Sequence, residues 1–191
     1  MKSFPRFLYS ICGSDVGADI PSIKGGQKID AYKSILGPTT MRIRRLIAGD
    51  YRSVRDIFHD AFDKEHLPVT DLGISWRNRS RPYSYGVFTW SGELVAFAII
   101  SFHKRNGANR YIDYIAVHSA YRGCGYGDIL MRQILRTCWK EHSGVHLYPL
   151  RYESLLKWYK KYGFYETHGM HLNFHSYQTR RQVRPPFLEE E

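Results

Sequence analysis

The amino-acid sequence predicts an α/β fold of three layers, in which a central mixed sheet lies between helices. The main observation is the order of its segments, because strand-like and helical patterns follow one another as β, α, α, β, β, β, α, β, α, β. A second observation is the size, since 191 residues with 43% hydrophobic content suffice for the core of one domain. The third is a glycine-rich turn between a strand and a helix near residue 125.

The predicted domain begins near Met41 and extends to Ser176. Residues 1–40 contain several glycines and little sustained periodicity, which indicates a weakly ordered N-terminal extension. Residues 177–191 contain a group of arginines followed by three terminal glutamates. This segregation of charge is typical of a solvated C-terminal tail. We therefore expect residues 41–176 to form the folded part of the chain.

The first elements follow from short apolar patterns. Residues 42–47 indicate a strand, and Asp50 is the candidate N-cap of a helix that extends to about Phe62. Apolar residues at helical spacing form its core-facing stripe: Val54, Ile57, Phe58, Ala61 and Phe62. Residues 67–79 are ambiguous, with a short second helix as the preferred interpretation.

The middle of the chain predicts three strands and a helix. Residues 85–90 and 94–103 flank a Ser-Gly-Glu turn and form a hairpin, and a fourth strand follows at 111–117. A helix then extends from Gly127 to about Glu141. Its apolar residues are expected to face the sheet: Ile129, Leu130, Ile134, Leu135 and Cys138.

The last predicted elements complete the sheet. Residues 145–150 form a fifth strand, and residues 151–162 form a helix that Gly163 ends in a left-handed conformation. Residues 170–176 form a late strand. The third layer of the fold therefore depends on the two helices after the glycine-rich turn.

Charge and cysteine content limit the classes of ligand and location. The formal net charge is +10, from 28 Lys and Arg against 18 Asp and Glu, which favours anionic ligands. Nucleic acid is not the favoured anion, because the basic residues are scattered and no zinc-finger or RNA-recognition motif occurs. Three cysteines without a CxxC pair and the lack of a typical signal peptide indicate an intracellular, cytoplasmic protein. The longest apolar run, Leu94 to Ile100, is too short to cross a membrane.

The glycine-rich turn predicts a binding site for a pyrophosphate. Glycine presents its amide without a Cβ and adopts positive φ, so several N–H groups converge on one anion where a helix begins. The turn fits neither common nucleotide motif, because Asp128 replaces the third small residue of a dinucleotide fingerprint and the Lys-Ser/Thr pair of a P-loop is absent. An ordinary strand-to-helix turn is the structural alternative. Cys124 is expected to contribute its amide and not a nucleophilic thiol.

The order Arg-x-x-Gly-x-Gly after the 111–117 strand resembles the acyl-CoA pyrophosphate loop of the GNAT superfamily of N-acyltransferases, and the resemblance covers residues 41–176. It implies a mostly antiparallel mixed sheet whose strands four and five splay apart to admit pantetheine, with helices on both faces. It also implies acetyl-CoA as the acyl donor, and no metal. The implied cofactor-binding residues are Ile115, Ala116, Val117, Arg122, Gly123, Cys124, Gly125, Tyr126, Gly127 and Asp128. Among the strand amides, one near Ile115 takes an oxyanion-hole role.

Residues 156–164, Leu-Lys-Trp-Tyr-Lys-Lys-Tyr-Gly-Phe, resemble the family's aromatic-Tyr-x-x-x-Gly-Phe signature. This places Tyr159 at the position of the family's general acid, where its hydroxyl protonates the departing CoA thiolate. A phenol with a pKa of about 10 suits a donor that stays protonated at neutral pH. The structural alternative is an aromatic side chain that only packs.

Asp113 stands nine residues before Arg122, where several members of the family carry a carboxylate near the acceptor amine. It is the candidate base, because removing the proton of an ammonium group with pKa near 10.4 costs roughly 4 to 5 kcal/mol at pH 7. The period of two places Asp113 on one face with Tyr111 and Ile115, so Tyr111 is a candidate for substrate binding. The alternative is a structural aspartate that pairs with an arginine.

Three positions depart from the family pattern. Ser119 stands where many members have proline, and Tyr152 stands where an asparagine that contacts pantetheine is common. His118 is an alternative base, although it points away from the face of Asp113. His142 and His146 are four apart, but Ser143-Gly144 interrupts any helix that would align them, so we expect no metal site there.

The resemblance implies an N-acetyltransferase that moves an acetyl group directly to a primary amine in a ternary complex. The acceptor is a small molecule or a protein, and the resemblance does not say which. A CoA-binding or basic interaction module without turnover is the alternative. We expect no membrane partner. Nucleic acid is a disfavoured partner, with binding through the N-terminal extension and the C-terminal tail as a third alternative, and a homodimer stays open.

Overall fold

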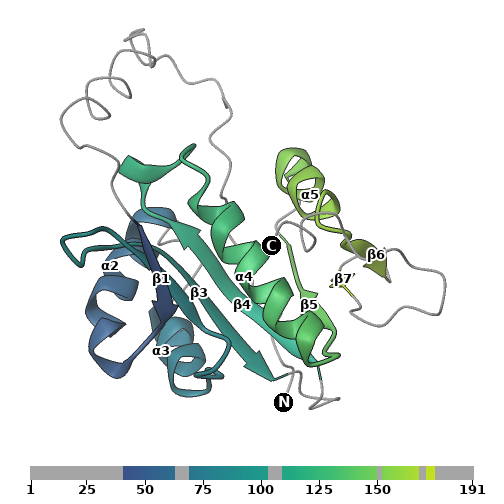
Figure 1. Ribbon diagram of the computed structural model, residues 1–191, viewed down its shortest axis with the longest axis horizontal. Coiled ribbons are helices and arrows are strands. Elements are labelled where there is room, and N and C mark those ends of the chain that lie inside the picture. Colours follow the sequence, from purple (N-terminus) through teal and green to yellow (C-terminus); the bar gives the residue numbers. More distant parts are fainter. Residues whose placement is uncertain (1–40, 63–68, 103–108, 150–151, 168–170, 175–191) are drawn as a thin grey trace, which may run out of the picture.

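Seven strands form one mixed sheet in the order β1-β2-β3-β4-β5-β7-β6 (Figure 1). The strands are β1 Arg42–Arg45, β2 Tyr85–Phe88, β3 Leu94–Phe102, β4 Arg110–Val117, β5 Val145–Leu147, β6 Tyr165–Thr167 and β7 His171–Phe174. The computed structural model describes residues 41–62, 69–102, 109–149, 152–167 and 171–174. The predicted extension of residues 1–40 and the predicted tail of residues 177–191 lie outside these ranges.

The pairing of the strands confirms the predicted mixed, mostly antiparallel sheet. β4 and β5 are parallel, whereas β1 with β2, β2 with β3, β3 with β4, β5 with β7 and β6 with β7 are antiparallel. The parallel pair is short, because β5 pairs only with the first three residues of β4. Beyond that point the two strands diverge, as Figure 1 shows.

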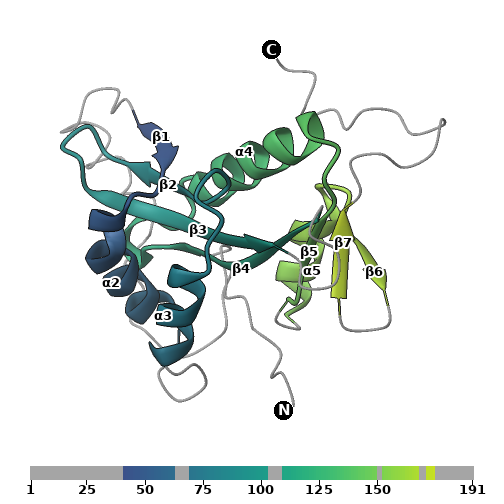
Figure 2. The same cartoon turned by 90° about the horizontal axis from the view of Figure 1, so that it is seen from below.

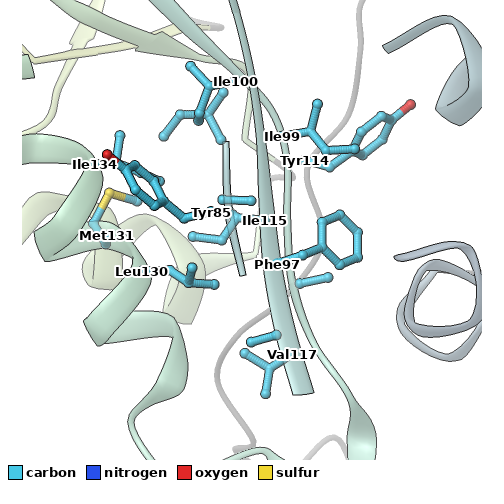
Figure 3. Close-up of a cluster of buried hydrophobic side chains, with 14 of the residues drawn as sticks. Tyr85, Phe97, Ile99, Ile100, Tyr114, Ile115, Val117, Leu130, Met131 and Ile134 are labelled. Carbon is cyan, nitrogen blue, oxygen red and sulfur yellow. The ribbon is translucent and has the colours of Figure 1, made fainter. Parts of the chain in front are cut away.

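Helices cover both faces of the sheet and complete the three layers. α2 (Tyr51–Ala61) and α3 (Val69–Arg77) lie on one face, and α4 (Tyr126–Lys140) lies on the other (Figure 2). In Figure 3, Phe97, Ile99 and Tyr114 point to the side of α2 and α3, and Ile100 and Ile115 point to α4. The central strands are therefore buried on both faces. None of the helices in the described residues is long and apolar enough to cross a membrane.

The helix predicted from Asp50 to Phe62 forms with Asp50 at its N-cap position, but the Asp50 side chain makes no capping hydrogen bond. α2 begins at Tyr51, directly after a short 3₁₀ turn, η1 (Ala48–Asp50). The Asp50 carboxylate accepts two hydrogen bonds of 2.8 Å from the Arg44 guanidinium and one of 2.8 Å from the Ile47 N–H. The bidentate ion pair with β1 therefore takes the carboxylate that the prediction assigned to the helix.

α4 confirms the predicted amphipathic helix and corrects one residue of its stripe. Its buried side chains are Leu130, Met131, Ile134, Leu135 and Cys138. Burial raises the pKa of the Cys138 thiol to about 12. Ile129, predicted to face the sheet, is 40% exposed because helical geometry turns it away from the row formed by the other four predicted residues.

The C-terminal part has one strand more than predicted. α5 (Glu153–Lys160) replaces the longer helix predicted at 151–162, and Gly163 has the expected left-handed conformation with φ of 86°. β6 follows directly and pairs with β7, so the late strand predicted at 170–176 is one arm of a hairpin. β6 is only three residues long, too short for a periodic pattern to reveal.

Candidate active site

The glycine-rich turn between β4 and α4 has the backbone that the sequence predicted. Gly123 and Gly125 have φ of 77° and 80°, and Gly125 stands at the N-cap position of α4. A Cβ placed on either glycine would meet no atom within 4 Å. Backbone conformation, and not crowding, therefore requires glycine at both positions, and the space beside the turn is open.

The start of α4 has the donors and the dipole that an anion site requires. The first N–H groups of a helix have no partner within that helix, and in α4 these belong to Tyr126, Gly127 and Asp128. The 15 residues of α4 add the positive end of a helix dipole at the same place. Open space, donors and dipole thus coincide where the sequence predicted an anion.

The side chain of Arg122 points back to the strand. Its Nε donates to the Val117 carbonyl oxygen at 3.3 Å, and its Nη2 lies 3.9 Å from the Asp60 carboxylate on α2. These contacts fix the start of the loop against the end of β4. The Arg122 N–H donates to the Ser119 carbonyl oxygen at 3.3 Å, so both the backbone and the guanidinium of Arg122 hold the loop in place, and neither is directed to the predicted cofactor site.

Replacing Gly125 with alanine is expected to weaken CoA binding at least tenfold. The left-handed conformation costs about 1 kcal/mol for an L-residue, and the added Cβ projects into the open space of the turn. Gly92 is a matched control, because it has φ of 87° in the β2–β3 hairpin and a Cβ there also meets nothing. Gly92→Ala should lose similar stability in urea denaturation and keep its affinity for CoA in calorimetry. Equal CoA affinities in the two variants would contradict the predicted cradle.

The pairing of β4 limits which of the predicted backbone amides can contact a cofactor. β5 pairs only with Arg110 to Ile112, so the later residues of β4 do not pair with β5. The His118 N–H donates to the Val95 carbonyl oxygen on β3, so by the period of two the Ala116 N–H faces β3 as well. The N–H groups of Ile115 and Val117 face the opposite edge, towards the gap in pairing. Of the three predicted amides, two are thus oriented for a ligand and Ala116 is not.

A β-bulge at Asp113 corrects the predicted alternation of β4. Ile99 pairs with Tyr114, whereas the next residue of β3, Ile100, pairs with Ile112, which leaves Asp113 as the extra residue. Ile115 consequently points to α4, as Figure 3 shows. It does not share the face of Asp113 and Tyr111, as the unbroken period had predicted.

Ser101, which the sequence reasoning did not name, contacts the candidate base Asp113. Asp113 is fully buried, and its Oδ1 accepts a hydrogen bond of 3.0 Å from the Ser101 hydroxyl. Ser101 is also the strand partner of Tyr111, so it brings these two predicted residues together. The available signal was a single hydroxyl within the apolar run of β3.

Tyr159 lies on α5 and is fully buried. Its ring contacts Trp158 at a centroid distance of 4.9 Å and Phe164 at 5.7 Å, both nearly edge to face. These contacts hold the ring in one orientation. The sequence predicted an acid here with a packing aromatic as the alternative, and the burial is compatible with both.

Asp128 joins the cofactor loop to the helix of Tyr159. Its Oδ1 accepts hydrogen bonds from Trp158 Nε1 at 2.9 Å, from Lys161 Nζ at 2.6 Å and from the Tyr162 hydroxyl. Partial burial opposes ionisation, but the three donors outweigh it and hold the pKa of Asp128 below its ordinary value. The carboxylate is thus engaged with α5, and only the main-chain amide of Asp128 is directed to the predicted cofactor site.

Replacing Asp128 with alanine is expected to lower the free energy of unfolding by about 2 kcal/mol at pH 7, the lower part of the range for charged hydrogen bonds because the group is partly exposed. The depressed pKa makes this contribution complete above about pH 4, and acid removes it as the pH falls through the folded-state value. Urea denaturation at pH 7 and at about pH 3 should therefore show the difference narrowing. Glu153→Ala, which removes an exposed pair with Lys157 on α5, should change neither result. A pH-independent difference would contradict this role of the charge.

The structure also places three further positions that the sequence analysis named: His118, Tyr152 and Cys124. His118 stands at the N-cap of a 3₁₀ turn, η2 (Ser119–Tyr121), where its Nδ1 accepts from the Ala120 N–H at 3.2 Å. Tyr152 is exposed at the start of α5, and Cys124 is exposed in the loop. No group of three or more His, Cys, Asp or Glu that could hold a metal occurs within the described ranges.

Comparisons with known proteins agree with this arrangement. The profile of the family described as "Acetyltransferase (GNAT) family" matches residues 51–164. A search of curated proteins found no match.

Solved structures show the same fold. Ard1 from Thermoplasma volcanium is similar, with a TM-score of 0.52 and 22% identity over 70% of this chain and 94% of that one. The ribosomal-protein-S18-alanine N-acetyltransferase from Escherichia coli has a TM-score of 0.57 and 16% identity over 76% and 99% of the two chains. A GNAT family N-acetyltransferase from Escherichia coli, solved in complex with CoA, has a TM-score of 0.58 and 16% identity over 74% and 84%. The family match extends from α2 through the glycine turn to α5, the helix of Tyr159. The chain therefore belongs to the GNAT family of acetyltransferases.

Proposed function

We propose that this protein transfers the acetyl group of acetyl-CoA to a primary amine by direct transfer in a ternary complex. The observation that carries the proposal is the position of the glycine turn. Its open, amide-lined side follows directly on the stretch of β4 that β5 leaves without a strand partner. One ligand that is both a diphosphate and an extended arm matches this combination.

Each part of the site has a role in this proposal. Amides of the turn from Gly123 to Asp128 hold the diphosphate, and the outward N–H groups of Ile115 and Val117 bind the pantetheine arm and polarise the thioester carbonyl. Asp113 orients the amine and accepts its proton, directly or through ordered water. Tyr159 gives its hydroxyl proton to the thiolate that leaves.

The acceptor in this proposal is an amine of a small molecule or of a protein. A screen with acetyl-CoA and a panel of amines, peptide N-termini and lysine peptides tests it, with release of free CoA thiol as the readout. We expect thermal stabilisation by acetyl-CoA and amine-dependent release of thiol. Absence of both would contradict the proposed function.

A CoA-binding module without turnover is the second candidate, and the full burial of Asp113 and Tyr159 favours it. The same screen separates the two functions. The module predicts stabilisation by CoA with no thiol release for any amine in the panel. An enzyme predicts that at least one amine raises the rate above hydrolysis.

A further inference from the structure

Asp60, which no motif singled out, makes a two-point contact with the turn that leads into the cofactor loop. Its Oδ2 accepts the Ser119 N–H at 2.6 Å, and its Oδ1 accepts the Ser119 hydroxyl at 2.6 Å. Hydrogen bonds to a charged acceptor are among the stronger ones in proteins. Burial opposes ionisation of Asp60, but the Ser119 bonds outweigh it, and the pKa of this carboxyl lies below its ordinary value.

The place of Asp60 in its own helix does not account for these contacts. It is the last residue but one of α2, where the negative end of the helix dipole disfavours a carboxylate. Its partners lie across the chain instead, in Ser119 and, at 3.9 Å, Arg122. The carboxylate therefore stabilises the junction after β4 more than it stabilises α2.

This junction decides where the cofactor loop begins. η2 is one 3₁₀ turn of three residues between the end of β4 and the glycine turn, and Ser119 is its first residue. Asp60 holds Ser119, while Arg122 at the far end of the turn bonds to the Val117 carbonyl oxygen. The distance between the amides proposed for the diphosphate and the outward amides of β4 is thereby fixed. In a site that binds one ligand at two places, a misplacement of about 1 Å can lower activity about 100-fold.

We propose that Asp60 is a positioning residue that sets the cofactor loop for binding CoA by fixing Ser119 at the start of η2. This inference rests on the proposed function, because it assigns the loop to CoA. It makes a prediction opposite to that of simple electrostatics. Loss of a negative charge near a diphosphate site should strengthen binding, whereas loss of a positioning contact should weaken it.

Calorimetry with CoA on the full chain distinguishes the two effects. Asp60→Ala is expected to raise the Kd for CoA about tenfold and to raise the KM for acetyl-CoA, with kcat at saturation unchanged. Asp56→Ala is the matched control, since Asp56 lies one turn earlier on α2, carries the same charge and is exposed. It should bind CoA as the unmodified chain does. Without ligand, Asp60→Ala should melt below Asp56→Ala because it loses the Ser119 hydrogen bonds, and both variants should be fully folded at the temperature of the calorimetry, so the loss of CoA affinity reports on the positioned loop and not on unfolding.

Ser119→Pro supplies the second arm of a double-mutant cycle. Proline suits the first position of a helical turn, and His118 before it already has the extended ψ of 137° that a residue before proline requires. The ring fixes the turn without Asp60, so Ser119→Pro should bind CoA within about threefold of the unmodified chain. Adding Asp60→Ala to Ser119→Pro should then change the Kd no further.

The outcomes separate this inference from the proposed function. Wild-type or tighter affinity in Asp60→Ala would overturn the positioning role alone. A tenfold effect of Asp60→Ala that persists in the Ser119→Pro background would overturn it too, because the effect would not pass through Ser119. If the unmodified chain does not bind CoA, the proposed function fails and this inference fails with it.

Discussion

Tyr159→Phe is expected to lower kcat by about 100-fold or more at saturating substrates, the usual range for loss of a general acid. The variant removes one hydroxyl and keeps the ring between Trp158 and Phe164, so the packing of α5 should survive. Because the hydroxyl acts on the leaving thiolate only during transfer, the KM for acetyl-CoA should change little. Steady-state kinetics with thiol release provide the measurement.

Tyr152→Phe is the matched control for this result. Tyr152 is an exposed tyrosine at the start of the same helix, and the same loss of a hydroxyl there should leave kcat unchanged. A Tyr159→Phe enzyme with wild-type kcat at saturation would remove the acid assignment. Tyr159 would then be a core aromatic, and the leaving thiolate would take its proton from another donor.

Asp113→Asn is expected to lower kcat/KM for the amine by about 100-fold at pH 7, the lower limit for loss of a general base. The amide has the shape of the carboxylate and still accepts the Ser101 hydroxyl, so the bulge of β4 should keep its geometry. The deficit should shrink as the pH rises towards the amine pKa near 10, because an amine that is already neutral needs no base. A profile of kcat/KM from about pH 7 to 9.5 tests this.

Ser101→Ala separates the charge of Asp113 from its orientation. This variant keeps the carboxylate and removes only the hydrogen bond from the Ser101 hydroxyl on β3, so a smaller loss with an unchanged pH profile is expected. If Asp113→Asn instead lowered the rate by the same factor at every pH, its role would be structural. The proton would then leave the amine by another route.

The fold was predicted from local sequence patterns, and the prediction is accurate for elements that are long enough to show such a pattern. The glycine turn is the clearest case, because Gly125 before a periodic helix specifies a positive φ without any tertiary contact. The apolar run of β3 and the stripe of α4 likewise follow from their own residues. Short elements fail for the same reason, and β6 gives a pattern of three residues that no periodicity can distinguish.

The sequence predicted which residues form the candidate site, but it did not predict how they are arranged in space. The period of two placed Ile115 beside Asp113, and the bulge separates them because β3 and β4 do not match residue for residue. Asp128 was predicted as part of the cofactor turn, and donors from Trp158 on α5 and from Lys161 and Tyr162 just after it connect its carboxylate to the C-terminal part of the sheet's cover. Ser101 and Asp60 carried no motif at all.

The sequence by itself determined the order of the elements from β1 to α5, the conformation of the glycine turn and the identity of the residues that resemble a GNAT site, because each depends on neighbours within a few positions. Only the tertiary structure decided that Asp60 holds Ser119 and that Asp128 holds α5. The contact between Asp60 and Ser119 joins residues 59 positions apart in the chain, and the contact between Asp128 and Trp158 joins residues 30 positions apart. Such contacts form because the sheet places residues that are distant in the chain next to one another near the end of β4. A pattern of neighbouring residues does not contain this information.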